Sequence, residues 1–341
     1  MDIFVLMRMV CSILMTLLLL AACQRHGGLR FLESEQRDGY TCSMVEYQGP
    51  GGDMIQVYLL EPDGDGPFPG LVLLHDHGAR FDIGKEKLVR PLASQPDHIR
   101  RSSQQWIDNH FDGVWIGDAL AAAGYAVIVP DMLYWGSRSS DACRRWSRAV
   151  YGIDSLSKAE IKALKAEVYE GQRAVYDSLA ARGSVWAWQT MREDSLAAAL
   201  LASRIKVSPD RIGACGWSMG GHRAWLLAAF CPDIKAGCTV SWMTLKSLQQ
   251  ESPSEYSMLV EVLRSQYDFP DIASFLKPRP YYFLSGDQDH LFPAWAVDSC
   301  YTLMHGIYGN DSHLRTEFFR GGHHCGKEVQ ERIVNWFEEM L

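Results

Sequence analysis

The sequence lacks several features that would point to particular classes of protein. Its nine cysteines include no CxxC pair, so neither a zinc ribbon nor a thioredoxin-like redox pair is indicated. Positive charge is not in excess: the net charge is −8, without long runs of one sign, which argues against binding nucleic acid through its phosphates. With 47% hydrophobic and 22% charged residues, a disordered or fibrous chain is a poor fit. We therefore expect a folded protein with a sizeable core.

The chain also has no apolar run that would make a comfortable transmembrane helix, for which about 20 residues are needed. The run Ile13–Ala22 ends in Leu-Ala-Ala-Cys at 20–23, and small residues before a cysteine resemble the lipobox of bacterial lipoproteins. The resemblance implies a lipoprotein signal peptide over 1–22, a lipid on Cys23, and an anchor to the membrane of the bacterial cell envelope. An ordinary signal peptide with an incidental cysteine is the alternative. The polar residues 23–39 are expected to form a flexible tether.

The remaining cysteines are expected to be small core residues. Removal of Cys11 with the signal peptide and use of Cys23 for lipid would leave seven, an odd number, so at least one thiol should be free.

From Tyr40 onward, strand-like apolar runs alternate with helical patterns, which is typical of a parallel sheet covered on both faces. No repeat or low-complexity linker interrupts this region. Apolar runs predict strands at 54–60, 70–74, 125–130, 211–215, 281–285 and 315–319. Periodic patterns and caps predict helices at 115–123, 157–182, 185–203, 223–230, from 252, 293–305 and 326–340.

The turn Gly-Trp-Ser-Met-Gly at 216–220 lies between a predicted strand and a predicted helix, the context in which Gly-x-Ser-x-Gly indicates a nucleophilic serine, here Ser218. Neighbouring segments approach such a turn so closely that side chains at 216 and 220 would collide, hence the two glycines. Because the turn places Ser218 at a helix N-terminus, the N–H of Met219 is the first candidate oxyanion donor. The alternative is a tight strand-to-helix turn without a catalytic role.

A serine hydroxyl is a weak nucleophile and needs a general base, which needs a partner that fixes its tautomer. Two carboxylates, Asp287 and Asp289, follow the strand predicted at 281–285. Two imidazoles, His323 and His324, follow the strand predicted at 315–319. The α/β-hydrolases use the same order along the chain: serine, acid, histidine.

Three motifs together resemble the dienelactone-hydrolase and acetylxylan-esterase branches of the α/β-hydrolase superfamily: Gly-x-Ser-x-Gly-Gly at 216–221, Gly-x-x-Asp at 286–289, and Gly-Gly-His at 321–323. The resemblance implies the α/β-hydrolase fold, with a mostly parallel central sheet, helices on both faces and a partial helical cap. We assign the catalytic domain to 40–341 and the cap to 134–185. The resemblance also implies that Asp289 is the acid and His323 the base, with Asp287 and His324 as the alternatives.

The segment His-Asp-His-Gly at 75–78 occupies the position of the family's His-Gly-x-Gly loop, whose backbone supplies the second oxyanion donor. Matched by position, this donor is the N–H of His77, although Asp76 stands where the family has its first glycine. A His-Asp-His metal site is the alternative, without supporting ligand spacing.

Two further groups of residues have open interpretations. A basic cluster could hold an acidic substrate, such as a uronate carboxylate, or could form a solvated helix face. Its members are Arg80, Lys85, Lys87 and Arg90. The eleven tryptophans could stack on sugar rings or fill the core.

The resemblance therefore predicts a serine esterase that forms an acyl-enzyme on Ser218 and needs no cofactor and no metal. Its substrate would be a small-molecule or polysaccharide ester, with acetyl or methyl esters of a carbohydrate favoured. One alternative is a serine peptidase of prolyl-oligopeptidase type, for whose additional domain the chain has no room. A lipase is disfavoured because no long apolar lid is visible. An inactive glycan-binding lipoprotein is the alternative from another class.

Overall fold

The computed structural model describes residues 28–248, 256–258, 266–309 and 313–341. The expected signal peptide, Cys23 and the start of the helix predicted from 252 lie outside the described residues. The strands are β1 (Arg30–Arg37), β2 (Tyr40–Gln48), β3 (Met54–Pro62), β4 (Phe68–Leu74), β5 (Ala126–Pro130), β6 (Val207–Trp217), β7 (Ile234–Val240), β8 (Tyr281–Gly286) and β9 (Leu314–Phe319). The α-helices are α2 (Asp97–His110), α3 (Ile116–Ala122), α4 (Asp141–Val150), α5 (Lys158–Ala181), α6 (Trp186–Ala202), α7 (Met219–Phe230), α9 (Ala273–Leu276), α10 (Ala294–Tyr308) and α11 (Lys327–Met340).

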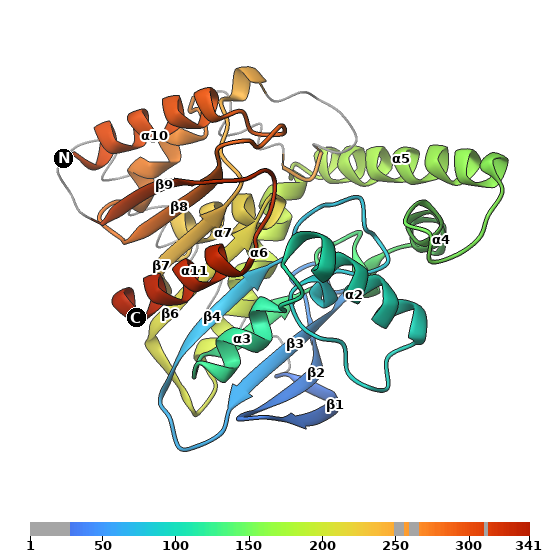
Figure 1. Cartoon of the computed structure of the whole chain (residues 1–341), viewed down its shortest axis with the longest axis horizontal. Helices are drawn as coiled ribbons and strands as arrows, with labels where there is room; N and C mark the ends of the chain where they lie inside the picture. The colour runs from blue at the N-terminus through green and yellow to red at the C-terminus, as the bar shows by residue number, and fades with distance from the viewer. Residues whose placement is uncertain (1–27, 249–255, 259–265, 310–312) are drawn as a thin grey trace.

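All the described strands belong to one sheet with the order β1-β2-β3-β5-β4-β6-β7-β8-β9. From β5 to β9 neighbouring strands are parallel, whereas β1, β2 and β3 are antiparallel to each other and β3 is antiparallel to β5. Helices lie on both faces of this sheet (Figure 1). The predicted architecture, a mostly parallel sheet covered on both faces, is confirmed.

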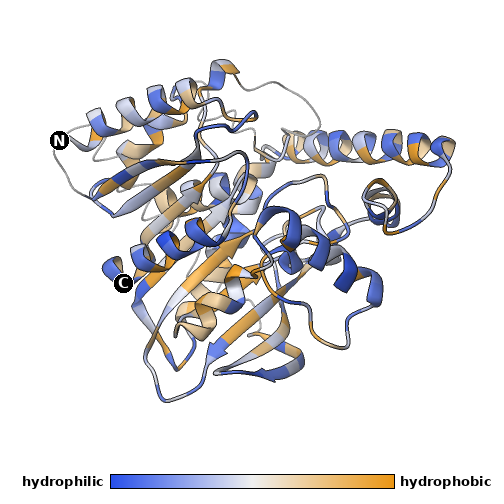
Figure 2. Ribbon diagram, viewed as in Figure 1, coloured by the Kyte–Doolittle hydropathy of each residue, from blue (hydrophilic) through white to orange (hydrophobic). Residues whose placement is uncertain are grey.

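The strand β4 illustrates why the apolar runs form the centre of the sheet. Leu71 and Leu73 belong to the core that contains α3 and α11, whereas Val72 and Leu74 belong to the core that contains α6 and α7. All four side chains are fully or almost fully buried. Burial of such a side chain contributes about 1.5–3 kcal/mol, so β4 is stabilised from both faces. Figure 2 shows the same concentration of apolar residues in the central strands.

The expected tether over 23–39 is wrong for residues 30–37, which form β1 and pair with β2. The strand has a polar sequence because it lies at the edge of the sheet and most of its side chains are exposed. Arg37 is the exception: its buried guanidinium lies 2.6 Å from Asp118 and 2.9 Å from Glu35. Ion pairs rather than apolar contacts therefore fix the end of this strand to the domain.

The region 134–185, predicted as a partial cap, contains α4 and α5. The capping box predicted at the start of α5 is present, since Ser157 and Glu160 each bind the other's backbone N–H. Leu164 and Val168 bury the inner stripe of α5, which runs outward from the sheet in Figure 1. No helix in the described ranges is both long and apolar enough to span a membrane.

The helix α2 was not predicted, because its sequence is almost entirely polar and Figure 2 colours it mostly hydrophilic. Its buried face includes Trp106 and Ile107. The seven cysteines of the described chain are all buried with free thiols, at positions 42, 143, 215, 231, 238, 300 and 325.

Candidate active site

A cleft of about 900 Å³ opens at the carboxyl ends of the parallel strands. It collects residues from the loops after β4, β6, β7, β8 and β9, from α2 and from the cap. The lining residues are Asp76, His77, Gly78, Trp106, His110, Tyr151, Trp217, Ser218, Trp242, Thr244, Leu248, Met258, His290, Leu291, Phe292, Gly322 and His323. Of the predicted site residues, Ser218, His323 and His77 line this cleft.

Ser218 is the residue between β6 and α7, and its backbone has φ 56° and ψ −128°. A positive φ is costly for a residue with a side chain and persists only where the surroundings impose it. The glycines of the turn explain how the surroundings do so. A Cβ at Gly216 would overlap the carbonyl group of Gly220, and a Cβ at Gly220 would overlap the carbonyl oxygen of Leu74. The predicted collisions at 216 and 220 are therefore present in the structure.

The carboxylate of Asp289 and the ring of His323 form a direct hydrogen bond, with 2.7 Å between Oδ2 and Nδ1. The other carboxylate oxygen accepts the backbone N–H groups of Leu291 at 2.8 Å and Phe292 at 3.2 Å. The side chain of Asp289 is fully buried. Because Nδ1 is held by the carboxylate, Nε2 is the ring nitrogen left to act in the cleft.

The alternative residues Asp287 and His324 are engaged elsewhere. Asp287 is exposed and accepts the backbone N–H of Gly321 at 2.9 Å. His324 places Nε2 3.1 Å from Asp112, and its ring is not part of the cleft wall. The structure thus pairs Asp289 with His323, as the resemblance implied, and leaves the two neighbours with structural contacts.

The candidate oxyanion donors come from two different loops, after β6 and after β4. Met219 is the first residue of α7, so its N–H is one of the groups that a helix leaves without an intrahelical partner. His77 lies in the loop after β4, and its carbonyl oxygen accepts hydrogen bonds from Lys87 Nζ and Trp135 Nε1, each at 2.9 Å. Its ring accepts the N–H of Ala79 at Nδ1, and burial lowers the pKa of this ring to about 3.

A metal site in the segment 75–78 was the alternative, but the side chains of His75 and Asp76 contact other protein groups. Nε2 of His75 accepts the N–H of Met132 at 3.1 Å, and Asp76 lies against Lys87 at 3.3 Å. Within the ranges that the structure describes, no three His, Cys, Asp or Glu side chains gather as metal ligands would.

Both interpretations of the basic cluster are wrong for three of its four members. Arg80, Lys85 and Lys87 are buried and face carboxylates rather than the cleft or the solvent. The pairs are Arg80 with Asp82 at 3.4 Å, Lys85 with Asp131 at 2.8 Å and Lys87 with Asp76 at 3.3 Å. Arg90 is exposed.

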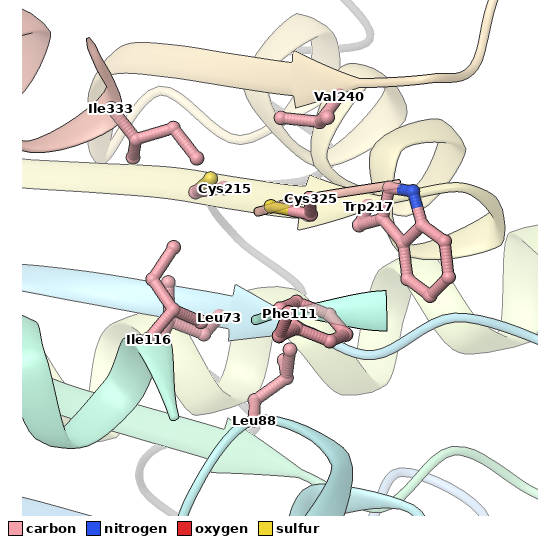
Figure 3. A pocket seen from close by; sticks show the side chains of 10 residues that line it. Leu73, Leu88, Phe111, Ile116, Cys215, Trp217, Val240, Cys325 and Ile333 are labelled. Carbon is pink, nitrogen blue, oxygen red and sulfur yellow. The ribbon is translucent and has the colours of Figure 1, made fainter. Parts of the chain in front are cut away.

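A small apolar void of about 10 Å³ lies behind the turn, under Trp217 (Figure 3). A water molecule needs at least that volume and two or more polar partners, and none of the void's exposed wall is polar. The void is therefore a gap in the core and not part of the candidate site. Its walls are Leu73, Leu88, Phe111, Ile116, Cys215, Gly216, Trp217, Val240, Cys325 and Ile333.

The tryptophans mainly fill the core, and three of them also form part of the cleft wall. Trp106, Trp217 and Trp242 belong to the wall of the cleft but are almost fully buried, and Trp135 and Trp186 are fully buried in the core away from it. His110 and Tyr151 also line the cleft and were not predicted from the sequence. No local signal identifies them, because α2 is a polar helix and Tyr151 follows α4 in an irregular segment.

Residues 104–335 match the model of the dienelactone hydrolase family. The chain belongs to this family. A relative from Bacillus subtilis (strain 168), named "Putative hydrolase YtaP", is 28% identical over 319 residues, which are 91% of each chain. Membership of a hydrolase family supports an enzyme, and the resemblance inferred from the motifs is confirmed.

Solved structures agree with this family in fold. A "putative acetyl xylan esterase (BF1801)" from Bacteroides fragilis NCTC 9343 superposes with a TM-score of 0.64 at 16% identity, over 92% of this chain and 74% of that one. A glucuronoyl esterase from Solibacter usitatus has a TM-score of 0.59 at 12% identity, over 92% of this chain and 86% of that one. At these identities the similarity establishes the α/β-hydrolase fold.

Proposed function

We propose that this member of the dienelactone hydrolase family is a serine esterase. Ser218 attacks the ester carbonyl while Nε2 of His323 takes the hydroxyl proton and then gives it to the leaving alcohol. Asp289 holds the imidazole in the required tautomer. The N–H groups of His77 and Met219 stabilise the oxyanion, and water then releases the acyl group from Ser218 with His323 again as the base.

The observation that carries this proposal is the hydrogen bond of 2.7 Å between Asp289 and His323, in a cleft that His323 shares with Ser218. A buried carboxylate bound to Nδ1 stabilises the imidazolium that forms when Nε2 accepts a proton. Two backbone N–H groups fix the carboxylate, so the ring is oriented before substrate binds.

Hydrolysis of p-nitrophenyl acetate by the wild type and Ser218→Ala tests the proposal. We expect the variant to lose about 10³-fold or more in kcat, because it has no nucleophile. A fluorophosphonate probe should add to Ser218 in the wild type and leave the variant unlabelled, as peptide mass spectrometry would reveal. Equal rates in the two proteins would exclude the serine mechanism and favour a binding protein.

We further propose that the substrate is a carbohydrate ester, acetyl or methyl. Two considerations support this: the structural neighbours include a putative acetyl xylan esterase and a glucuronoyl esterase, and the partly exposed rings of Tyr151 and Phe292, which could stack on sugars, line the cleft. A panel of acetylated and methyl-esterified polysaccharides, with release of acetate and methanol measured separately, would identify the ester. Release of neither by an enzyme active on p-nitrophenyl acetate would exclude the carbohydrate substrate.

We also propose that Cys23 carries a lipid that anchors the protein in the bacterial cell envelope, because the sequence at 20–23 resembles a lipobox. In a bacterial host fed an alkyne fatty acid, the wild type should become labelled and fractionate with membranes. Cys23→Ser should remain unlabelled. Labelling of both proteins, or of neither, would contradict lipidation at Cys23.

A further inference from the structure

The last residue of α2, His110, places an imidazole in the cleft that the proposed mechanism does not use. Its ring centroid lies 4.2 Å from that of Trp106 and 5.3 Å from that of Trp217. The ring centroid of His323 in turn lies 4.9 Å from that of Trp217. His110 and the proposed base therefore neighbour the same indole ring.

The backbone fixes this position as well. The carbonyl oxygen of His110 accepts the N–H of Cys325 at 2.9 Å, two residues beyond His323. The end of α2 is thereby joined to the loop that carries the proposed base. A side chain held by two rings and a backbone contact loses little entropy when it binds a ligand.

The ring nitrogens of His110 have no hydrogen-bond partner within the described chain. His324, by contrast, is bound to Asp112. Burial lowers the pKa of His110 to about 4, an effect that His323, His324 and Lys87 reinforce and Asp76 opposes. At neutral pH the ring is uncharged, with one nitrogen as donor and the other as acceptor, which matches a hydroxyl group.

The charge of the cleft favours the same kind of ligand. None of the described lining residues is an Arg or Lys, and the nearby cation Lys87 is buried against Asp76 and His77. A carboxylate or phosphate would find no cationic partner on these residues. Aromatic side chains and a neutral imidazole suit an uncharged, hydroxyl-bearing ring.

We propose that His110 determines specificity by hydrogen bonding a hydroxyl group of an uncharged sugar in the alcohol half of the ester. This inference rests on the proposed esterase function, and it names a class of substrate: O-acylated neutral sugars. His110 binds the substrate and takes no part in the proton transfers at Ser218.

The experiment compares a mono-O-acetylated methyl xyloside with p-nitrophenyl acetate, which has the same acyl group and no sugar. His110→Phe keeps an aromatic ring beside the two tryptophans and removes both nitrogens. We expect the ratio of kcat/KM for the sugar acetate to that for p-nitrophenyl acetate to fall about tenfold, through KM, as loss of one hydrogen bond implies. His110→Gln, which can donate and accept, should restore part of the ratio.

Deoxy analogues of the sugar, combined with the His110 variants, form a thermodynamic cycle that isolates the hydrogen bond between His110 and one hydroxyl group. Removal of the hydroxyl that His110 binds should lower kcat/KM in the wild type and have no further effect in His110→Phe. The control His324→Phe replaces a ring outside the cleft and should keep the wild-type ratio. Thermal unfolding of each variant separates a binding defect from a folding defect, and His110→Gln decides the question if the Phe variant does not fold.

The outcomes separate the two proposals. A wild type that hydrolyses p-nitrophenyl acetate, with a ratio unchanged in His110→Phe and His110→Gln, overturns the role of His110 and leaves the esterase. A wild type active on the aryl ester that cleaves only sugars with a free carboxylate overturns the neutral-sugar class. A wild type inactive on both esters overturns the esterase and this inference with it.

Discussion

The ammonium group of Lys87 lies 2.9 Å from the carbonyl oxygen of His77, the residue whose N–H is the proposed second oxyanion donor. It also lies 2.9 Å from the carbonyl oxygen of Asp76 and 3.3 Å from its carboxylate. Burial lowers the pKa of Lys87, and the carboxylate opposes that shift. A single buried cation thus holds two consecutive peptide groups of the loop after β4.

Lys87→Met should therefore impair catalysis without removing any group that touches substrate. We expect kcat to fall about ten- to hundredfold, less than for loss of an oxyanion donor itself, because the His77 amide remains but is less firmly held. The substitution also leaves the buried carboxylate of Asp76 without its cation, which should lower the free energy of unfolding by about 3 kcal/mol or more. Urea unfolding and p-nitrophenyl acetate kinetics measure the two effects.

The double variant Lys87→Met/Asp76→Asn separates these effects. It removes the unpaired charge, so stability should largely return while kcat stays low. Arg90→Met, at an exposed position three residues away, is the control for loss of a cation. Wild-type kcat in a folded Lys87→Met protein would contradict a role of Lys87 in holding the loop after β4.

The two carboxylates after β8 should differ sharply in their effect on activity. Asp289→Asn removes the acceptor for Nδ1 of His323 and favours the wrong tautomer, so we expect a loss of about 10³–10⁴-fold in kcat. Asp287→Asn changes an exposed side chain bound to the N–H of Gly321, and a loss of less than about tenfold is expected. A greater loss in Asp287→Asn than in Asp289→Asn would reverse the assignment.

The turn around Ser218 makes a prediction about stability. A Cβ at Gly220 would overlap the backbone of Leu74 in β4, and neither segment can move without shifting the sheet. Gly220→Ala should lower the free energy of unfolding by about 3 kcal/mol or more.

Gly306→Ala provides the matched control. Gly306 lies in α10 with open space around the position of a Cβ, so alanine should stabilise the protein by about 0.5–1 kcal/mol. Urea denaturation of both variants measures the difference. Similar stability of the two would mean that the close approach at 220 is absent in solution.

The turn at 216–220 and six of the described strands could be predicted because their signals are local; these strands are β3, β4, β5, β6, β8 and β9. An apolar run such as 70–74 needs no distant partner to be recognised, and the glycines on both sides of Ser218 follow from the shape of one turn. The choice of Asp289 over Asp287 came from the family pattern, since both carboxylates follow the same strand.

The remaining features depend on partners far along the chain. Lys85 can be buried because Asp131, 46 residues away, accepts hydrogen bonds from its ammonium group and its backbone N–H. Nothing near Lys85 in the sequence indicates that pairing. β1 and α2 have polar sequences and owe their places to a few contacts, such as those of Arg37 and Trp106. His110 could not be predicted for the same reason.

Three buried histidines make the fold sensitive to acid. Burial lowers the pKa of His77 and His222 to about 3, and that of His75 well below its usual value. Above about pH 6.5 the rings are neutral in both states and contribute nothing. Below it the unfolded chain binds protons that the native state refuses, so each ring lowers the free energy of unfolding by about 1.4 kcal/mol per pH unit until the folded pKa is reached.

Urea denaturation between pH 6.5 and 5.0, in a range above most carboxylate titrations, should measure this slope together with the contribution of His110, whose pKa is also lowered. His222→Phe tests one contribution, because the ring of His222 packs on Trp242 and its buried Nε2 has no partner within the described chain. The variant should lose stability with falling pH less steeply, by about 1.4 kcal/mol per unit. A slope equal to that of the wild type would mean that His222 is already protonated in the native protein, or that its unfolded pKa is as low as its folded one.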